Sequence, residues 1–365
     1  MKLHFYFARR FALTFAMVFA LLFGLFVMVD LVEELQDFSK VDLGFLPTLG
    51  MTLLNVPQGL YQLLPIIVLI ATLVMFLGLA RSSELVVTRA AGRSAMRALL
   101  APISVIFIIG VLCVTVFNPM VSATSRQYDL KRTELLKGEQ QVFSVSDEGL
   151  WLRQGSDAGH FVIRASRSNL DATELFGVTF MGFGPDNAPT ERIEATSARL
   201  TTGAWVLTQA KVWPLRASDN PERDATTAAQ MTIDTTLTLD EIRDSFGTPS
   251  AIPFWDLPQF IARLEAAGFS ARAYRMWYQS ELALPFAFVA MLMIGAGFTM
   301  RHTRLGRTGP AVLSALMLAF GFYFLRNFAT VLGENGQLPV IAAAWVPPLA
   351  VILLTLSLLL HFEDG

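Results

Sequence analysis

Six long apolar runs constrain the fold of this chain more than any other feature. They lie at about residues 11–36, 56–80, 98–122, 278–300, 308–332 and 338–360. Each provides the ~20 apolar residues that a helix needs to cross a bilayer. The composition is typical of a membrane protein, because 53% of residues are hydrophobic, 16% are charged and the mean hydropathy is +0.50. We therefore predict a polytopic α-helical membrane protein with six transmembrane helices, three before and three after a long polar insert.

Charges in the short connections predict the orientation of these helices. Loops rich in Lys and Arg stay in the cytoplasm. The connections at 37–42 and 333–338 contain one basic residue, Lys40. Three other segments are richer in basic residues: Arg9 and Arg10; Arg81, Arg89, Arg93 and Arg97; Arg301, Arg304 and Arg307. Both termini are therefore expected in the cytoplasm and the insert outside it. The first run has no small-residue cleavage site after it, so we expect an uncleaved membrane helix.

The insert, residues 126–274, has the pattern of a β-rich domain. Short runs rich in Val, Ile, Thr, Phe and Trp occur at 160–165, 175–183, 193–200, 205–213 and 231–239, separated by Gly, Pro and Asn. They predict an antiparallel sandwich or jelly-roll-like fold. A helix should follow, starting at Asp256 with Pro258 in its first turn and ending at Gly268. We divide the chain into residues 1–125, 126–274 and 275–365.

Several functional classes are excluded by missing motifs. The sequence has no GxxxxGK[ST] phosphate loop, no HExxH, no GxSxG and no Cys/His metal cluster. A net charge of -2 argues against binding nucleic acid. We expect no catalytic residue, no bound metal and no cofactor in this chain, so ATP hydrolysis, if used, takes place in another subunit.

A polar island, Arg81 to Arg97, separates the second and third apolar runs. Ser82 or Ser83 can cap a short helix over about residues 82–92, with Glu84 in its first turn and Gly92 at its end. Such a helix would lie along the cytoplasmic surface and seat in a groove of a partner. The alternative is a basic loop that only fixes topology.

Four carboxylates end the first apolar run. Asp30, Glu33, Glu34 and Asp37 share one helical face by their spacing. Carboxylates at membrane depth are costly, which favours a functional role. The alternative is an ordinary solvated helix end.

The polar island also carries a family resemblance. Ser83-Glu84-Leu85-Val86-Val87 followed by Arg89-Ala90-Ala91-Gly92 resembles the coupling-helix signature of the lipopolysaccharide export permeases, the LptF/LptG (YjgP/YjgQ) family. The resemblance covers essentially the whole chain. Gly149-Leu150-Trp151, the stretch from Trp277 to Pro285, and Pro347 are more similar to the LptG branch than to LptF.

The resemblance implies a function and partners. Members are permease subunits of an ABC transporter that extracts lipopolysaccharide from the bacterial inner membrane and passes it to a periplasmic bridge. An LptF-like permease would complete a heterodimer, an LptB-like ATPase dimer would hold ATP, and LptC/LptA-like proteins would form the bridge. Glu84 would contact the ATPase, supported by Ser83, Leu85, Thr88, Arg89 and Gly92.

The acidic row departs from the family pattern, which often has basic residues in the first span to hold lipopolysaccharide phosphates. The acids could act through bridging divalent cations, could meet a head group with fewer phosphates or more amines, or could pair within the protein. For the last case we predict a pair of Asp30 with Arg326 at a lateral gate between the first and fifth helices. Asp30, Glu33, Glu34, Asp37 and Arg326 are therefore the candidates for the substrate gate.

Two other functional classes stay open. A secondary transporter would need charged or broken helices near the bilayer midplane, whereas the charges here lie near the helix ends. A membrane-anchored periplasmic assembly or binding protein is the other alternative.

Overall fold

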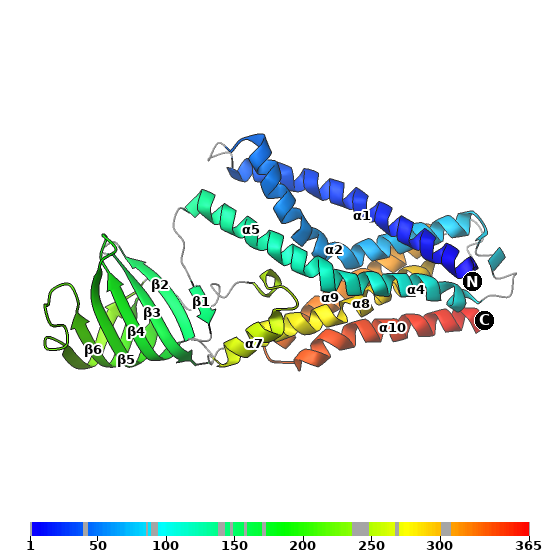
Figure 1. The fold of residues 1–365 in the computed structure, drawn as a ribbon. Coiled ribbons are helices and arrows are strands. Elements are labelled where there is room, and N and C mark those ends of the chain that lie inside the picture. Colours follow the sequence, from blue (N-terminus) through cyan, green and yellow to red (C-terminus); the bar gives the residue numbers. More distant parts are fainter. Residues whose placement is uncertain are drawn as a thin grey trace. The chain divides into compact units, whose positions relative to one another are not determined.

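The computed structural model describes residues 2–38, 43–84, 87–88, 94–137, 143–146, 149–156, 159–169, 173–235, 248–266, 270–300 and 308–364. These residues form two compact units (Figure 1). The helical unit consists of Met1–Arg132, Ser250–Trp255 and Arg275–Gly365. The β-rich unit consists of Thr133–Pro249 and Asp256–Tyr274.

The six predicted membrane helices are confirmed. The helices are α1 (Lys2–Asp37), α2 (Phe45–Arg81), α4 (Ala95–Leu112), the π-helical η2 (Cys113–Phe117), α5 (Asn118–Lys137), α8 (Arg272–Thr299), α9 (Thr308–Glu334) and α10 (Val340–Asp364). Six helical stretches in the described part of the chain are long and apolar enough to cross a membrane, with α4, η2 and α5 together forming the third. α2 starts at Phe45 rather than residue 56 and contains Pro57 and Pro65.

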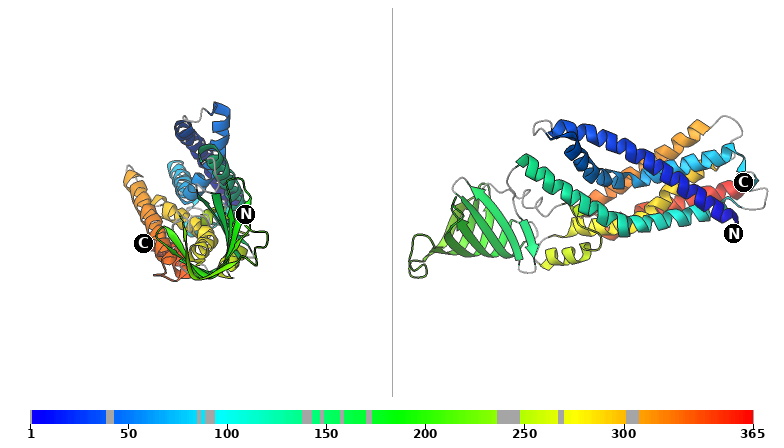
Figure 2. Two further views of the ribbon diagram at one scale, coloured as in Figure 1. Left: turned by 90° about the vertical axis from the view of Figure 1, so that its left-hand side faces the viewer. Right: turned by 45° about the horizontal axis from the view of Figure 1, so that its top comes forward.

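α8 lies at the centre of the helical unit. It is the most buried of the six spans, and α1 and α9 are the least buried. Its residues Phe288, Leu292 and Ile294 pack in one core with Leu64 and Phe76 of α2. In the same unit, α1 lies beside α2 and α4, and α9 lies beside α10 (Figure 2). α8 therefore contributes much of the apolar core of the helical unit.

The β-rich insert is also confirmed. Its strands are β1 (Phe143–Ser146), β2 (Gly149–Ser156), β3 (Gly159–Ser168), β4 (Glu174–Phe183), β5 (Pro189–Thr201), β6 (Ala204–Pro214) and β7 (Thr226–Asp234). They form one curved seven-stranded sheet in which each strand pairs antiparallel with the next (Figure 2). Among the described strands the order is a meander, without the crossover of a Greek key.

One face of this sheet is apolar because alternate residues along each strand point to the same side. Leu152, Ile163, Phe180 and Ile193 are aligned across four strands and are fully or almost fully buried. β1 and β2 were not predicted, and the predicted run at 231–239 is shifted, since β7 ends at Asp234. The antiparallel strands therefore share one apolar, buried face.

The helix after the sheet is confirmed as α7 (Leu257–Ala266), with Pro258 in its first turn. The backbone oxygen of Asp256 accepts a hydrogen bond from the amide of Phe260. Its predicted end at Gly268 lies outside the described residues. A single turn, η3 (Pro249–Ala251), precedes this helix.

Candidate functional site

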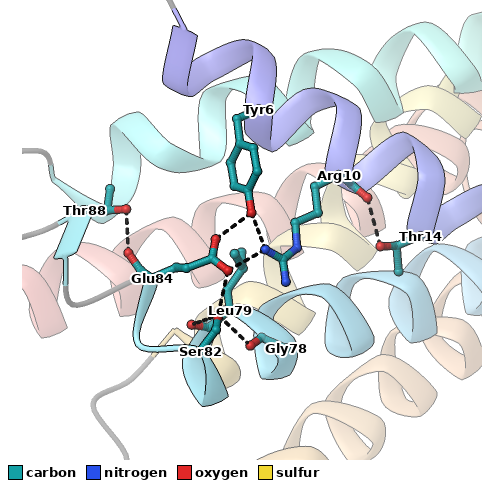
Figure 3. A network of polar contacts seen from close by, with 8 residues as sticks. All are labelled: Tyr6, Arg10, Thr14, Gly78, Leu79, Ser82, Glu84 and Thr88. Carbon is teal, nitrogen blue, oxygen red and sulfur yellow. Dashed lines mark hydrogen bonds and ion pairs between the residues drawn. The ribbon is translucent and has the colours of Figure 1, made fainter.

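Three donors surround the carboxylate of Glu84, just after the end of α2 (Figure 3). Tyr6 of α1 donates its hydroxyl hydrogen to Oε2 at 2.7 Å. Arg10 of α1 and Ser82 each donate to Oε1 at 2.7 Å. Arg10 also donates to the Tyr6 hydroxyl, one helical turn earlier. In the folded chain, the start of α1 and the predicted coupling segment therefore meet around one carboxylate.

The backbone after α2 turns sharply to present Glu84. α2 ends at Arg81, and the Ser82 hydroxyl oxygen lies 3.1 and 3.3 Å from the carbonyl oxygens of Gly78 and Leu79, which compete with Glu84 for its single hydrogen. Ser83 has φ of 57°, a left-handed conformation that costs a residue with a side chain about 1 kcal/mol or more. Thr88 closes the next turn by donating to the carbonyl of Glu84 at 2.7 Å. These bonds hold a strained corner in place.

Glu84 is ionised at neutral pH. Partial burial opposes its charge, but the hydrogen bonds from Tyr6, Ser82 and Arg10 outweigh this effect and hold the pKa of Glu84 below its ordinary range. About a third of the side chain, 34%, remains exposed. The carboxylate is therefore both fixed in position and open to a partner.

The predicted coupling helix at about residues 82–92 is only partly described. Glu84, Val87 and Thr88 are helical, whereas Leu85, Arg89 and Gly92 lie outside the described residues. The apolar side chain of Val87 is strongly exposed. Sequence reasoning missed Tyr6 and Arg10 as members of the site, because Arg10 already had an explanation as a marker of topology.

Three of the four predicted acidic residues on α1 face neighbouring helices. Asp30 accepts a hydrogen bond from Asn55 of α2 at 2.8 Å. Glu34 is buried and accepts from the hydroxyl of Tyr128 in α5. Asp37 forms an ion pair with Arg132 of α5 at 2.8 Å. Glu33, the fourth acid, is exposed.

These acids are not fully satisfied. Oδ2 of Asp30 and Oε2 of Glu34 are buried and have no hydrogen-bond partner among the described residues. A buried oxygen without a donor is costly. The row therefore pins α1 to α2 and α5 while leaving two acceptors unused. The part of the chain that the structure describes contains no cluster of three His, Cys, Asp or Glu side chains suited to a metal.

The predicted pair of Asp30 with Arg326 is wrong. Asp30 takes its hydrogen bond from Asn55 instead. The charge of Arg326, on α9, interacts with the carboxylate of Glu281 on α8. Within the described residues no ion pair joins Asp30 to Arg326. The neighbouring helix α2 offers a closer amide, so depth alone was a poor guide to the partner.

Glu281 is a buried carboxylate that sequence reasoning missed. It is 3% exposed and accepts a hydrogen bond from the hydroxyl of Tyr61 in α2. Asn118, at the start of α5, lies near this carboxylate, and its Oδ1 atom accepts a hydrogen bond from the amide of Phe254 at 2.9 Å. Four helices and the Ser250–Trp255 segment therefore meet at one polar cluster. A signal was present, since Glu281 is an acid on the apolar fourth span.

Six membrane-crossing helices, three on each side of an antiparallel β-rich insert, define a class of polytopic membrane protein. A sequence model of the family described as Lipopolysaccharide export system permease LptF/LptG matches residues 5–361. The chain belongs to this family.

Named relatives agree with this assignment. The chain is 25% identical over 354 residues to Lipopolysaccharide export system permease protein LptG of Escherichia coli strain K12, covering 92% of this chain and 93% of the relative. It is 22% identical over 345 residues to the protein of the same name from Haemophilus influenzae, covering 93% of each. These similarities support a role in lipopolysaccharide export.

Proposed function

We propose that this chain is the non-catalytic permease subunit of an ABC transporter that extracts lipopolysaccharide from the inner membrane and passes it to a periplasmic bridge. Membership of the export permease family over residues 5–361 supports the transport role. One observation supports transport driven by ATP: Glu84 is an ionised and partly exposed carboxylate on a short segment between two membrane spans.

The contact with the ATPase follows from the chemistry of this segment. A fixed carboxylate is suited to a lysine or arginine of the partner, and charge-assisted hydrogen bonds are among the strongest in proteins. The exposed Val87 side chain lies one turn further along and can add apolar contact. Ser83, Leu85, Thr88, Arg89 and Gly92 support this contact. ATP binds to the partner subunit, and this chain supplies no catalytic group.

The remaining partners follow from the family. An LptF-like permease covers part of the exposed apolar surface of the helical unit and completes a heterodimer. LptC/LptA-like proteins receive lipopolysaccharide on the side of the β-rich unit. The termini lie in the cytoplasm and the β-rich unit in the periplasm. Asp30, Glu33, Glu34, Asp37 and Arg326 are candidates for residues along the path of the substrate.

Co-purification tests this function. The tagged chain, expressed in its host and extracted from membranes, is expected to bring down a second permease and an ATPase. Glu84→Lys should release the ATPase, because it places a cation against a cation, while the second permease stays bound. Arg9→Gln, an exposed change on α1, is the control. An active, gradient-driven transporter that contains no ATPase would contradict the proposal and favour a secondary transporter.

A further inference from the structure

We propose that Tyr6 and Arg10 of α1 are positioning residues for the contact between Glu84 and the ATPase, so that the start of α1 belongs to the docking site. This inference rests on the proposed function. It adds to the predicted coupling segment a helix that is distant in the sequence.

The first step is the geometry of the carboxylate. Each oxygen of Glu84 has a donor from α1: the Tyr6 hydroxyl lies 2.7 Å from Oε2, and the Arg10 guanidinium lies 2.7 Å from Oε1. Two donors at different oxygens fix both the position and the plane of the carboxylate. A partner cation then meets an ordered acceptor rather than a mobile side chain, which lowers the entropy cost of binding.

The second step is the order of Arg10 itself. Its guanidinium lies over the Tyr6 ring at 5.7 Å from the centroid and donates to the Tyr6 hydroxyl. On its other side it approaches Gly78 of α2, where an added Cβ would lie 3.7 Å from Nη2. Arg10 is therefore held between its own helix and α2 before any partner binds.

The third step is the backbone strain beside Glu84. Ser83 occupies the left-handed region, with φ of 57°. Such strain persists where surrounding bonds impose it, and it clusters at functional positions. The bonds from α1 to Glu84 supply part of this constraint, since they attach the residue immediately after the strained one. Removing them is expected to let the segment relax and to move the carboxylate.

The same contacts could instead form a lock in which Arg10 occupies Glu84 and competes with the ATPase. Exposure favours positioning. The side chains of Arg10 and Glu84 retain 30% and 34% of their surface, so a partner can reach Glu84 without displacing Arg10. A carboxylate has about four acceptor positions, and the donors from Tyr6, Arg10 and Ser82 occupy three of them.

The test measures binding of the ATPase that co-purifies with the wild-type complex. Permease complexes stripped of ATPase are placed in lipid nanodiscs, and the dissociation constant of the added ATPase is determined for each variant. Arg10→Gln is expected to weaken binding about tenfold, the effect of one hydrogen bond to a charged group. Tyr6→Phe, which keeps the ring, should weaken it by less. Arg10→Lys, which keeps the positive charge, should weaken ATPase binding less than Arg10→Gln does.

A double-variant cycle separates positioning from general stability. In a Glu84→Gln background, Arg10→Gln should change binding less than twofold, because its effect passes through the Glu84 charge. Arg9→Gln removes the same charge one residue away and should leave binding unchanged. Thermal melting of each purified complex verifies that it is folded.

The outcomes distinguish the two proposals. If the wild-type complex binds no ATPase, the proposed function fails. If Glu84→Gln weakens binding while Arg10→Gln and Tyr6→Phe leave it unchanged, only the positioning role is overturned. Tighter binding by Arg10→Gln would also overturn it and would establish a lock.

Discussion

Glu84 is the residue whose protonation can be predicted from its neighbours. Hydrogen bonds from Tyr6, Ser82 and Arg10 outweigh partial burial and lower its pKa below 4.5. A group with a depressed folded pKa stabilises the fold above its unfolded pKa, and this contribution is lost as pH falls through the folded pKa. The bonds around Glu84 should therefore persist from neutral pH down to below pH 4.5.

Infrared difference spectra of the full chain can follow this titration, with Glu84→Gln identifying the carboxyl band. In Arg10→Gln the pKa of Glu84 should rise toward its ordinary range, since an opposite charge and a hydrogen-bond donor have been removed. Arg9→Gln should leave it unchanged. A band that titrates at the same pH in both Arg10→Gln and wild type would contradict this explanation.

Glu281 and Arg326 make a second prediction at the scale of residues. Glu281→Gln keeps a hydrogen-bonding group beside Tyr61 but removes the charge that interacts with Arg326. We expect a loss of about 2 kcal/mol in the free energy of unfolding, typical of a buried polar group deprived of its partner. Reversible unfolding in mixed detergent micelles measures this loss.

The double variant Glu281→Gln/Arg326→Gln should lose less than the sum of the two single variants, because the interaction is removed only once. Asn327→Ala, an exposed change next to Arg326, is the control. Strictly additive losses would mean that the two charges act independently. The sequence predicted that Asp30 pairs with Arg326 because the two residues were expected at similar depth, but similar depth does not reveal which helices are adjacent.

Helix α4 approaches α8 so closely that only glycine is accommodated at one position. A Cβ added to Gly110 would lie 2.6 Å from the Cα of Pro285 and 3.3 Å from Phe288. Because a backbone atom cannot move aside as a side chain can, Gly110→Ala should force the helices apart and cost about 1–3 kcal/mol.

Gly321→Ala on α9 is the matched control, since nothing lies within 4 Å of the added Cβ. It should be neutral or more stable by up to ~1 kcal/mol, the helix propensity difference. Thermal melting of the purified variants compares the two. Equal melting temperatures for both variants would show that α4 and α8 separate easily.

At the scale of elements, the sequence predicted apolar helices and alternating strands because both have a period. It did not predict the π-helical turn Cys113–Phe117 inside the third span, where the composition is as apolar as in an α-helix. The structure gives a physical reason for this turn: the carbonyl of Thr115 accepts a hydrogen bond from Trp255 Nε1 at 3.0 Å. That partner is remote in the sequence, so local periodicity carries no trace of it.

The whole molecule shows the same limit. The division into three spans, a β-rich insert and three spans was predicted correctly, since hydropathy alone determines it. The candidate site was predicted only as far as Glu84, whose neighbours in sequence mark it. Tyr6 and Arg10 join it through the packing of α1 against α2, and such packing requires the folded chain.

Topology is the remaining prediction for the whole molecule. Basic segments at Arg9 and Arg10, at 81–97 and at 301–307 predict that both termini and Glu84 lie in the cytoplasm and that the β-rich unit lies outside it. In a Cys113→Ala background, Thr202→Cys in the exposed turn between β5 and β6 should react with a membrane-impermeant maleimide in spheroplasts. Val87→Cys, which is also exposed, should react only after permeabilisation. The reverse labelling pattern would place Glu84 outside the cytoplasm, where no cytoplasmic ATPase could reach it. It would contradict both the predicted topology and the proposed coupling to ATP hydrolysis.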